Sequence, residues 1–105
     1  MRFVETPVFT RDVDGLMPDD DYRALQLALL LRPEQGAVIP GGGGVRKLRW
    51  GIKVRGKRGG VRVIYYWDKP NSTIYLLLMY PKSRQEDITP GQLRALSHLI
   101  REEFR

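Results

Sequence analysis

The chain has no cysteine and a single histidine, His98. Without cysteine there can be no disulfide framework, no thiolate nucleophile and no metal site with sulfur ligands. A catalytic triad would have to use His98, and a metal site would need carboxylates almost alone. We therefore expect neither a metal nor a cofactor, and we expect His98 to be structural or to face the solvent.

Long apolar runs are also missing. The longest uncharged apolar stretch, residues 74–80, is far shorter than the ~20 residues that span a bilayer. Residues 1–10 are interrupted by Glu5 and Pro7 and do not have the pattern of a signal peptide. We expect a cytoplasmic protein with no membrane partner. The 105 residues suffice for one modest core, so we predict a single domain over residues 1–105.

Acidic residues are nearly absent from the middle of the chain. Residues 38–82 carry ten Lys or Arg and one acid, Asp68, in a chain of net charge +6. Residues 45–63 contain no acid and eight basic residues, namely Arg46, Lys47, Arg49, Lys53, Arg55, Lys57, Arg58 and Arg62. A solvated surface usually mixes both signs. The block therefore indicates an anionic polymer as the partner, with an ordinary soluble basic face as the alternative.

The first half of the chain predicts a strand followed by helices. Residues 3–9 are a strand candidate, and residues 11–17 form a connector or a short helix. A longer helix begins at Pro18, because proline and the three aspartates after it suit a first helical turn, and it ends at Arg32 before a second proline. Its wide leucine stripe packs into the core or in part meets a partner protein. Residues 36–44 are a glycine-rich loop, which forms a flexible hinge or a tight backbone passage.

The second half predicts three antiparallel strands and a final helix. Residues 45–55 alternate between apolar and basic side chains, which is the pattern of a strand with one apolar face. One face receives Leu48, Trp50, Ile52 and Val54, and the other receives Lys47, Arg49, Gly51, Lys53 and Arg55. Residues 61–67 form the next strand, and residues 73–80 form a strand that is apolar on both faces and hence central in the sheet. The last helix begins at a capping box, Thr89–Gln92.

These elements predict an α+β fold, with an antiparallel sheet whose N-terminal helices and C-terminal helix pack on one face. The other face would carry the cations. The basic strand is joined to the next by a turn at residues 56–60. A four-residue turn at 56–59 would place Lys53 opposite Arg62 on the cationic face. We expect this register, another with an even number of turn residues, or a compensating bulge.

Several segments resemble the RelE superfamily of toxins and, within it, the HigB-like branch. The main ones are Gly-Val-Arg-Lys-Leu-Arg-Trp (44–50), Gly-Lys-Arg-Gly-Gly-Val-Arg-Val-Ile-Tyr-Tyr-Trp (56–67) and Leu-Leu-Met-Tyr-Pro-Lys (77–82). Residues 3–9 and 33–41 also resemble that branch. The resemblance covers nearly the whole chain and implies the α+β fold predicted above.

The resemblance implies the toxin of a type II toxin–antitoxin pair. Such toxins enter the ribosomal A site and cut translated mRNA, so the implied partners are the ribosome, mRNA and a cognate antitoxin with a DNA-binding domain. Arg62 matches the arginine that contacts the scissile phosphate, and Lys82 matches the basic residue after the last central strand. Some relatives stack a base on a tyrosine near the C-terminus. Residues 87–89 occupy that region here, so we consider Tyr66 a possible substitute.

The resemblance and the chemistry of RNA together suggest how the basic residues divide the work. The 2′-hydroxyl of RNA can attack the adjacent phosphate if a group accepts its proton and cations stabilise the developing charge. We expect Lys53 or Lys82 to accept the proton, because neighbouring cations can favour a neutral lysine. Arg62 would hold the phosphate, and Arg49 or Arg55 would assist the leaving oxygen. The remaining basic residues, Arg46, Lys47, Lys57 and Arg58, would contact ribosomal or messenger phosphates.

Two other functions are compatible with the sequence. One is a ParE-like toxin, which inhibits a topoisomerase by contact and cuts nothing. The other is a plain RNA- or DNA-binding module that stacks bases on Trp50, Tyr65, Tyr66 or Trp67. Three of these aromatic residues alternate onto the apolar strand face, where we expect them in the core. The cationic strand face favours RNA cleavage over both alternatives.

Overall fold

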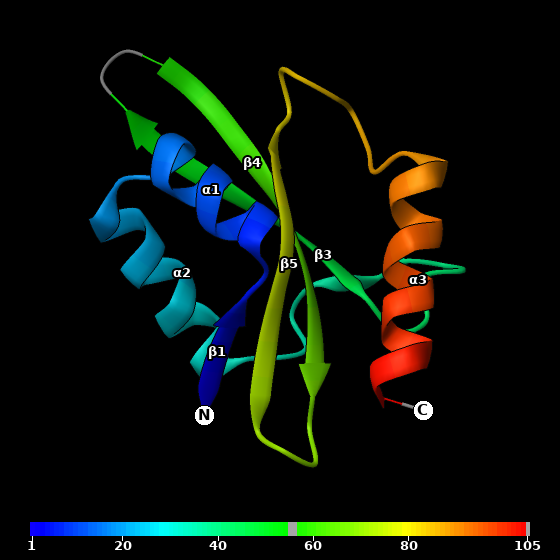
Figure 1. The fold of residues 1–105 in the computed structure, drawn as a ribbon. Coiled ribbons are helices and arrows are strands. Elements are labelled where there is room, and N and C mark those ends of the chain that lie inside the picture. Colours follow the sequence, from blue (N-terminus) through cyan, green and yellow to red (C-terminus); the bar gives the residue numbers. More distant parts are fainter. Residues whose placement is uncertain (55–56, 105) are drawn as a thin grey trace.

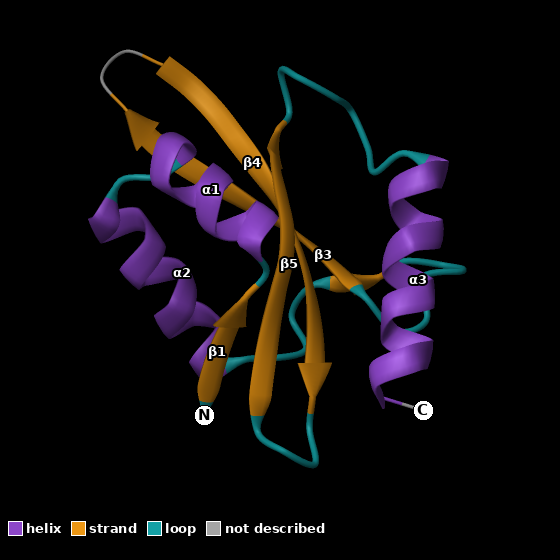
Figure 2. Cartoon of the chain, viewed as in Figure 1, coloured by secondary structure: helices purple, strands orange, loops and turns teal. Residues whose placement is uncertain are grey.

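The computed structural model describes residues 1–54 and 57–104, with the backbone alone at 53, 54 and 57–59. The helices and strands follow one another in the order β1 (Arg2–Glu5), α1 (Pro7–Leu16), α2 (Asp19–Leu31), β2 (Ala37–Val38), β3 (Arg46–Val54), β4 (Lys57–Asp68), β5 (Thr73–Pro81) and α3 (Pro90–Phe104). Figure 2 shows the helices on the two sides of a twisted sheet. The predicted α+β class and the three-strand meander β3–β4–β5 are confirmed.

The sheet has five strands in the order β1-β5-β4-β3-β2, so the central strand is β4 and not β5 as predicted, although β5 is also interior. Two further details of the predicted fold differ. The sheet is mixed, because β1 pairs with β5 in parallel. The helices cover both faces, because α1 and α2 pack on one core cluster, which contains Val63 and Leu76, whereas α3 packs on another, which contains Ile64 and Leu77. Figure 1 shows α3 on the opposite side from α1 and α2.

The N-terminal strand ends sooner than predicted. β1 stops at Glu5, and Thr6 caps α1 by accepting the backbone N–H of Phe9 at 3.1 Å. Proline at the next position fits the first turn, since its missing N–H would be unpaired there in any case. Residues 7–9 are therefore helical, and α1 runs through Gly15 to Leu16. Of the two alternatives predicted for residues 11–17, a connector or a short helix, the helix is confirmed, because α1 covers residues 11–16.

The predicted boundaries of the other two helices are confirmed. α2 carries three aspartates in its first turn and ends before Arg32. At the start of α3, the Gln92 N–H donates to the Thr89 hydroxyl at 3.1 Å, and the Thr89 N–H donates to the Gln92 side chain at 2.9 Å. This reciprocal pair is the predicted capping box.

The glycine-rich loop between α2 and β3 is a tight passage. Gly41, Gly43 and Gly44 have φ angles of 77°, 74° and 110°, which other residues rarely adopt. A side chain at Gly43 would contact Ser97 of α3 at 3.5 Å. The start of the loop is fixed by Tyr65, whose hydroxyl donates to the Pro33 carbonyl at 2.7 Å and accepts the Gly36 N–H at 2.9 Å. Burial raises the pKa of Tyr65.

Two features of the sheet set which side chains share a face. Val54 pairs with Lys57, so the β3–β4 connection has an even number of residues, as expected, but it is shorter than the predicted turn. Arg62 consequently lies opposite Arg49, and Lys53 lies opposite Arg58. The second feature is a β-bulge in β5. Ile64 pairs with Leu78 and Tyr65 with Leu76, so Leu77 is the extra residue.

Candidate nucleic-acid interface

The face of the sheet on which α3 packs has two halves of different chemistry. We call the first the apolar half, and its buried residues are Val45, Ile64, Leu77, Tyr80 and Ile100. We call the second the cationic half, and its described basic residues are Arg49, Arg62 and Lys82. The cationic half lies toward the hairpin ends of β3 and β4, which extend away from α3 (Figure 1). The predicted cationic strand face therefore exists, but α3 covers part of it.

Arg49, Arg62 and Tyr80 form one row across β3, β4 and β5. Arg49 pairs with Arg62, and Arg62 pairs with Tyr80. Residues that are directly opposite in antiparallel strands point to the same face, with Cβ atoms about 5 Å apart. Two like charges in these positions destabilise a sheet. The row thus concentrates positive charge at a cost to stability.

Arg62 is mostly buried and has no partner among the described residues. Its side chain belongs to the buried set at 8% exposure, whereas Arg49 is exposed. Among the described residues, no hydrogen bond and no ion pair is made by the Arg62 guanidinium. A buried arginine is usually paired, because removing a charge from water costs several kcal/mol. The arrangement at Arg62 is that of a site prepared for an anion.

Lys82 joins this group from β5. It follows Pro81 at the end of the strand, is exposed, and its backbone N–H donates to the Gly60 carbonyl at 3.1 Å. Gly60 precedes Arg62 by two residues and therefore lies on the same face. The structure thus brings Lys82 and Arg62, which are far apart in the sequence, to the same end of the sheet.

An acidic residue that the sequence analysis did not select lies at the border of the two halves. The Asp87 carboxylate is 3.2 Å from the Lys47 ammonium group. The Ile88 N–H donates to Asp87 at 2.8 Å, and this bond, followed by Lys47, lowers the pKa of Asp87. The basic block contains no acid that could balance Lys47, so an acid from elsewhere in the chain was to be expected beside it. The sequence does not indicate which one.

Tyr80 is the second group at this border. Its hydroxyl is buried and lies near the Asp87 carboxylate. Burial raises the pKa of Tyr80, the Asp87 carboxylate raises it further, and Arg62 acts in the opposite direction. Tyr80 therefore interacts electrostatically with both the Asp87 carboxylate and the Arg62 guanidinium.

The other predicted basic site residues differ in how much of them the structure describes and in which face of the sheet they lie on. Arg55 lies outside the described residues. Lys53, Lys57 and Arg58 are described only by their backbone, in paired positions of β3 and β4. Arg46 lies on the opposite face from Arg49, and its guanidinium donates to the carbonyls of Glu34 at 3.0 Å and Gly36 at 2.9 Å. These bonds hold the loop, and the predicted contact of Arg46 with phosphates stays a prediction.

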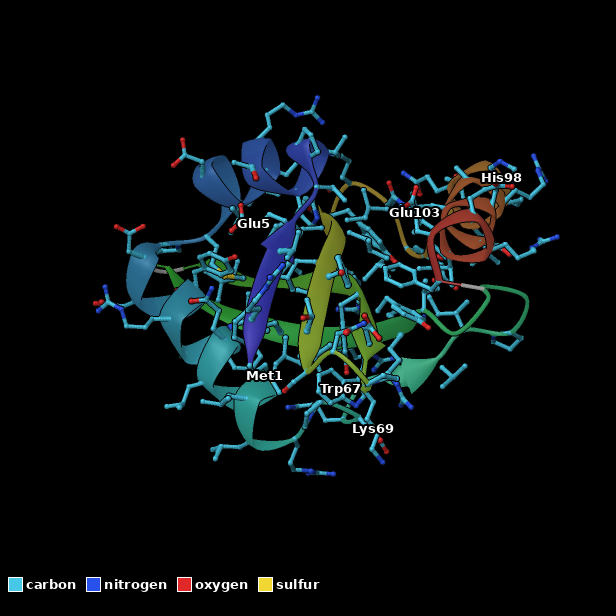
Figure 3. All side chains as sticks on the ribbon, turned by 60° about the horizontal axis from the view of Figure 1, so that its bottom comes forward. Met1, Glu5, Trp67, Lys69, His98 and Glu103 are labelled. Carbon is cyan, nitrogen blue, oxygen red and sulfur yellow. The ribbon has the colours of Figure 1, made fainter. Side chains whose placement is uncertain are left out.

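Tyr66 does not offer a free ring to a base. It stacks on Phe104 of α3, with ring centroids 4.8 Å apart and an interplanar angle of 30°. The prediction for the other aromatic residues is confirmed, because Tyr65 is in the core and Trp50 and Trp67 pack against it. His98 lies on the outer side of α3 (Figure 3), where its side chain is 74% exposed. This agrees with one of the two alternatives expected for His98, namely that it faces the solvent.

The described residues offer neither a metal site nor a membrane-spanning helix. These residues contain no group of three or more His, Asp or Glu side chains arranged to hold a metal ion. None of the described helices is both long and apolar enough to cross a membrane. The chemistry available in the cationic half is that of fixed cations, which bind an anion and stabilise negative charge that develops on it.

One comparison with known proteins identifies the family. Residues 29–104 match the family described as the RelE toxin of the RelE / RelB toxin–antitoxin system. The match includes α3 and all the strands except β1, and therefore the whole cationic half. The resemblance that the basic strands suggested is thus confirmed at the level of the family, and the chain belongs to the RelE toxin family of type II toxin–antitoxin systems.

Proposed function

We propose that this toxin is a ribosome-dependent endoribonuclease of the HigB-like branch, which cuts translated mRNA in the A site and so inhibits translation. Membership of the RelE toxin family supports mRNA cleavage in general. Residues 3–9 and 33–41, whose sequence resembles the HigB-like branch, support the finer assignment. The enzyme would act in the cytoplasm, where its messenger and ribosome are found.

The observation that carries this proposal is Arg62, a residue that is only 8% exposed and whose guanidinium has no partner among the described residues. An RNA phosphate would supply the missing partner and would form two parallel hydrogen bonds with the fork of the arginine. Arg49, directly opposite, would add a second cation to the same phosphate or to the next one. The cost of holding two like charges together is then offset when the substrate binds.

The reaction needs only the RNA, the basic side chains and water. The 2′-oxygen forms a bond to the adjacent phosphorus, and the bond from phosphorus to the 5′-oxygen breaks. The products are a 2′,3′-cyclic phosphate and a free 5′-hydroxyl. A neutral lysine takes the proton of the 2′-hydroxyl, and the leaving 5′-oxygen takes a proton from water. Arg62 stabilises the charge on the non-bridging oxygens in the transition state.

Two lysines and two arginines remain candidates for the other roles. Lys82 lies beside Gly60 in the cationic half and is our first choice as proton acceptor. Lys53 remains the alternative, with its side chain outside the described residues. Arg49 is our first choice for stabilising the leaving oxygen, because it lies opposite Arg62, and Arg55 is the alternative.

We further propose that a cognate antitoxin with a DNA-binding domain neutralises the toxin. Two surfaces are suitable. An acidic antitoxin segment would cover the cationic half and compete with RNA. Alternatively, an apolar segment would pack on the exposed leucines of α2, which are Leu27, Leu30 and Leu31.

Induced expression followed by primer extension on a translated mRNA tests the proposal. Wild-type toxin should stop translation and produce breaks at codon positions. Arg62→Ala and Lys82→Ala should each reduce cleavage by about 100-fold or more, the usual loss when a group that stabilises transition-state charge is removed. Lys69→Ala, at an exposed lysine in the β4–β5 turn, is the matched control and should cleave normally.

Two outcomes would contradict the assignment. Full toxicity and cleavage by both variants would remove Arg62 and Lys82 from the site. DNA damage without mRNA breaks would instead favour a toxin that inhibits a topoisomerase.

A further inference from the structure

Two glycines face each other in the cationic half. Gly51 of β3 pairs with Gly60 of β4, and the carbonyl of Gly60 accepts the Lys82 N–H at 3.1 Å. Both glycines lie on the same sheet face as Arg49 and Arg62, two residues away along their strands. We call Gly51 and Gly60 the glycine strip. It is a section of sheet surface without side chains, bordered by these two arginines and ending at Lys82.

The backbone does not require glycine at either position. The described glycines with positive φ are Gly41, Gly43 and Gly44, so neither residue of the strip needs the conformational freedom of glycine. Glycine in the interior of a strand weakens it, because it loses more entropy on folding and has no side chain to pack. Two such residues side by side therefore reduce the stability of the sheet without a local reason.

The space above the strip leads to Arg62. A Cβ atom added at Gly51 would have no heavy atom within 4 Å. A Cβ atom at Gly60 would lie 3.7 Å from the Nη1 atom of Arg62, so a side chain there would rest on the guanidinium. Arg62 itself is buried at 8% exposure. A ligand can reach it only where neighbouring side chains leave the surface open.

We propose that the glycine strip is the seat of the RNA backbone, and that it admits one unpaired strand to Arg62. The phosphodiester would lie over Gly60, with its non-bridging oxygens on Arg62 and the neighbouring ribose over Gly51. An unpaired strand fits better than a duplex, because a phosphate reaches a recessed guanidinium only if the sugars beside it approach the sheet closely. This inference rests on the proposed function and specifies how its substrate is held.

The test is a series of side chains of increasing size at one position. Gly51→Ala, Gly51→Val and Gly51→Leu leave all basic residues in place, and the first atom that each adds, the Cβ, has no described heavy atom within 4 Å. Two quantities are measured for each variant. The first is cleavage of translated mRNA. The second is binding of a single-stranded RNA oligonucleotide, measured by fluorescence anisotropy. This oligonucleotide carries deoxyribose at the cleavage site, so the attacking 2′-hydroxyl is missing there. Gly15→Leu, at an exposed glycine of α1, is the control.

We expect cleavage and binding to fall with side-chain size, reaching about 10- to 100-fold for Gly51→Leu, which corresponds to the loss of one charge-assisted contact. The melting temperature should stay the same or rise, and Gly15→Leu should behave like wild type. Wild-type levels of both cleavage and binding in Gly51→Leu would overturn the proposed role of the glycine strip while leaving the proposed role of Arg62 intact.

The two readouts also separate this inference from the proposed function. If the wild-type protein binds the oligonucleotide, Gly51→Leu does not, and neither cuts translated mRNA, the strip is supported and the nuclease function fails. If the wild-type protein neither binds nor cuts, both proposals fail.

Discussion

Arg62 and Ile64 are two residues apart on β4, point to the same side of the sheet and are both buried, yet their surroundings differ completely. Ile64 is 0% exposed within the cluster that packs on α3. Arg62 is 8% exposed and has no ion pair with the described residues. Burial of Ile64 is expected to stabilise the fold, whereas burial of the Arg62 charge without a partner costs free energy, which the proposed RNA phosphate would offset. Burial alone therefore does not distinguish a core residue from a binding residue, and the presence or absence of a partner does.

The border between the apolar and cationic halves is set by the loop before α3. This loop supplies Asp87, which pairs with Lys47. Lys47 is thereby neutralised, whereas Arg49, two residues further along β3, has no acid beside it among the described residues. The protein thus balances its positive charge where the fold must be held together and leaves it unbalanced where we propose that RNA binds.

The largest effect that we expect on stability separates the two halves directly. Ile64→Ala should lower the free energy of unfolding by about 3 kcal/mol, because it leaves a cavity in the core. Arg62→Leu should leave that free energy unchanged or raise it by about 1 kcal/mol, because it removes an unpaired buried charge. Urea unfolding, followed by tryptophan fluorescence, measures both. A loss at Arg62→Leu as large as that at Ile64→Ala would mean that Arg62 is a structural residue.

A smaller effect concerns the salt dependence of RNA binding. Each phosphate contact to a single strand contributes about 0.7 to the slope of log K against log salt concentration. Arg49→Ala should reduce that slope by about 0.7 and weaken binding about tenfold at low salt. Arg23→Ala, at an exposed arginine of α2, should change neither. An unchanged slope in Arg49→Ala would exclude Arg49 from phosphate binding.

The smallest effect is a pH dependence at the border. The pKa of Asp87 is lowered in the folded protein. Its contribution to stability is therefore present above its unfolded pKa of about 4 and is lost as the pH falls through the lower, folded value. Asp87→Asn should reduce stability by less than about 1 kcal/mol at about pH 7, because the side chain is 63% exposed.

Thermal unfolding of both proteins at about pH 7 and about pH 3 measures this contribution. The difference between them should shrink at the lower pH. A difference that is the same at both pH values would show that the charge of Asp87 is not what holds the loop.

The parts of the fold that depend on local patterns were predictable. Strict alternation of side chains in residues 46–52 placed Leu48 and Trp50 on the core face and Arg49 on the other, because the period of a strand is two. The capping box at Thr89 was found in the same way. Thr6-Pro7 carries a similar signal, a capping residue before a proline, but the apolar residues around it also fit the pattern of a strand.

The parts that depend on distant contacts were not predictable. The burial of β5 on both faces implied a cover on each side, but the sequence did not indicate that α3 supplies the second one. The partner of Arg62 across the hairpin depended on the length of a glycine-rich turn, and glycines fit turns of several lengths. The unpaired state of Arg62 follows from these long-range arrangements, so only the structure revealed it.

The extra residue in β5 has a consequence for the chemistry of the whole face. Before Leu77, the even-numbered residues Ile74 and Leu76 belong to the core under α1 and α2, and after it Tyr80 belongs to the side of α3. Without this one-residue irregularity, the alternation would send Tyr80 inward and take Lys82 with it. A single inserted leucine thus decides whether a lysine from the end of β5 can meet an arginine from the middle of β4.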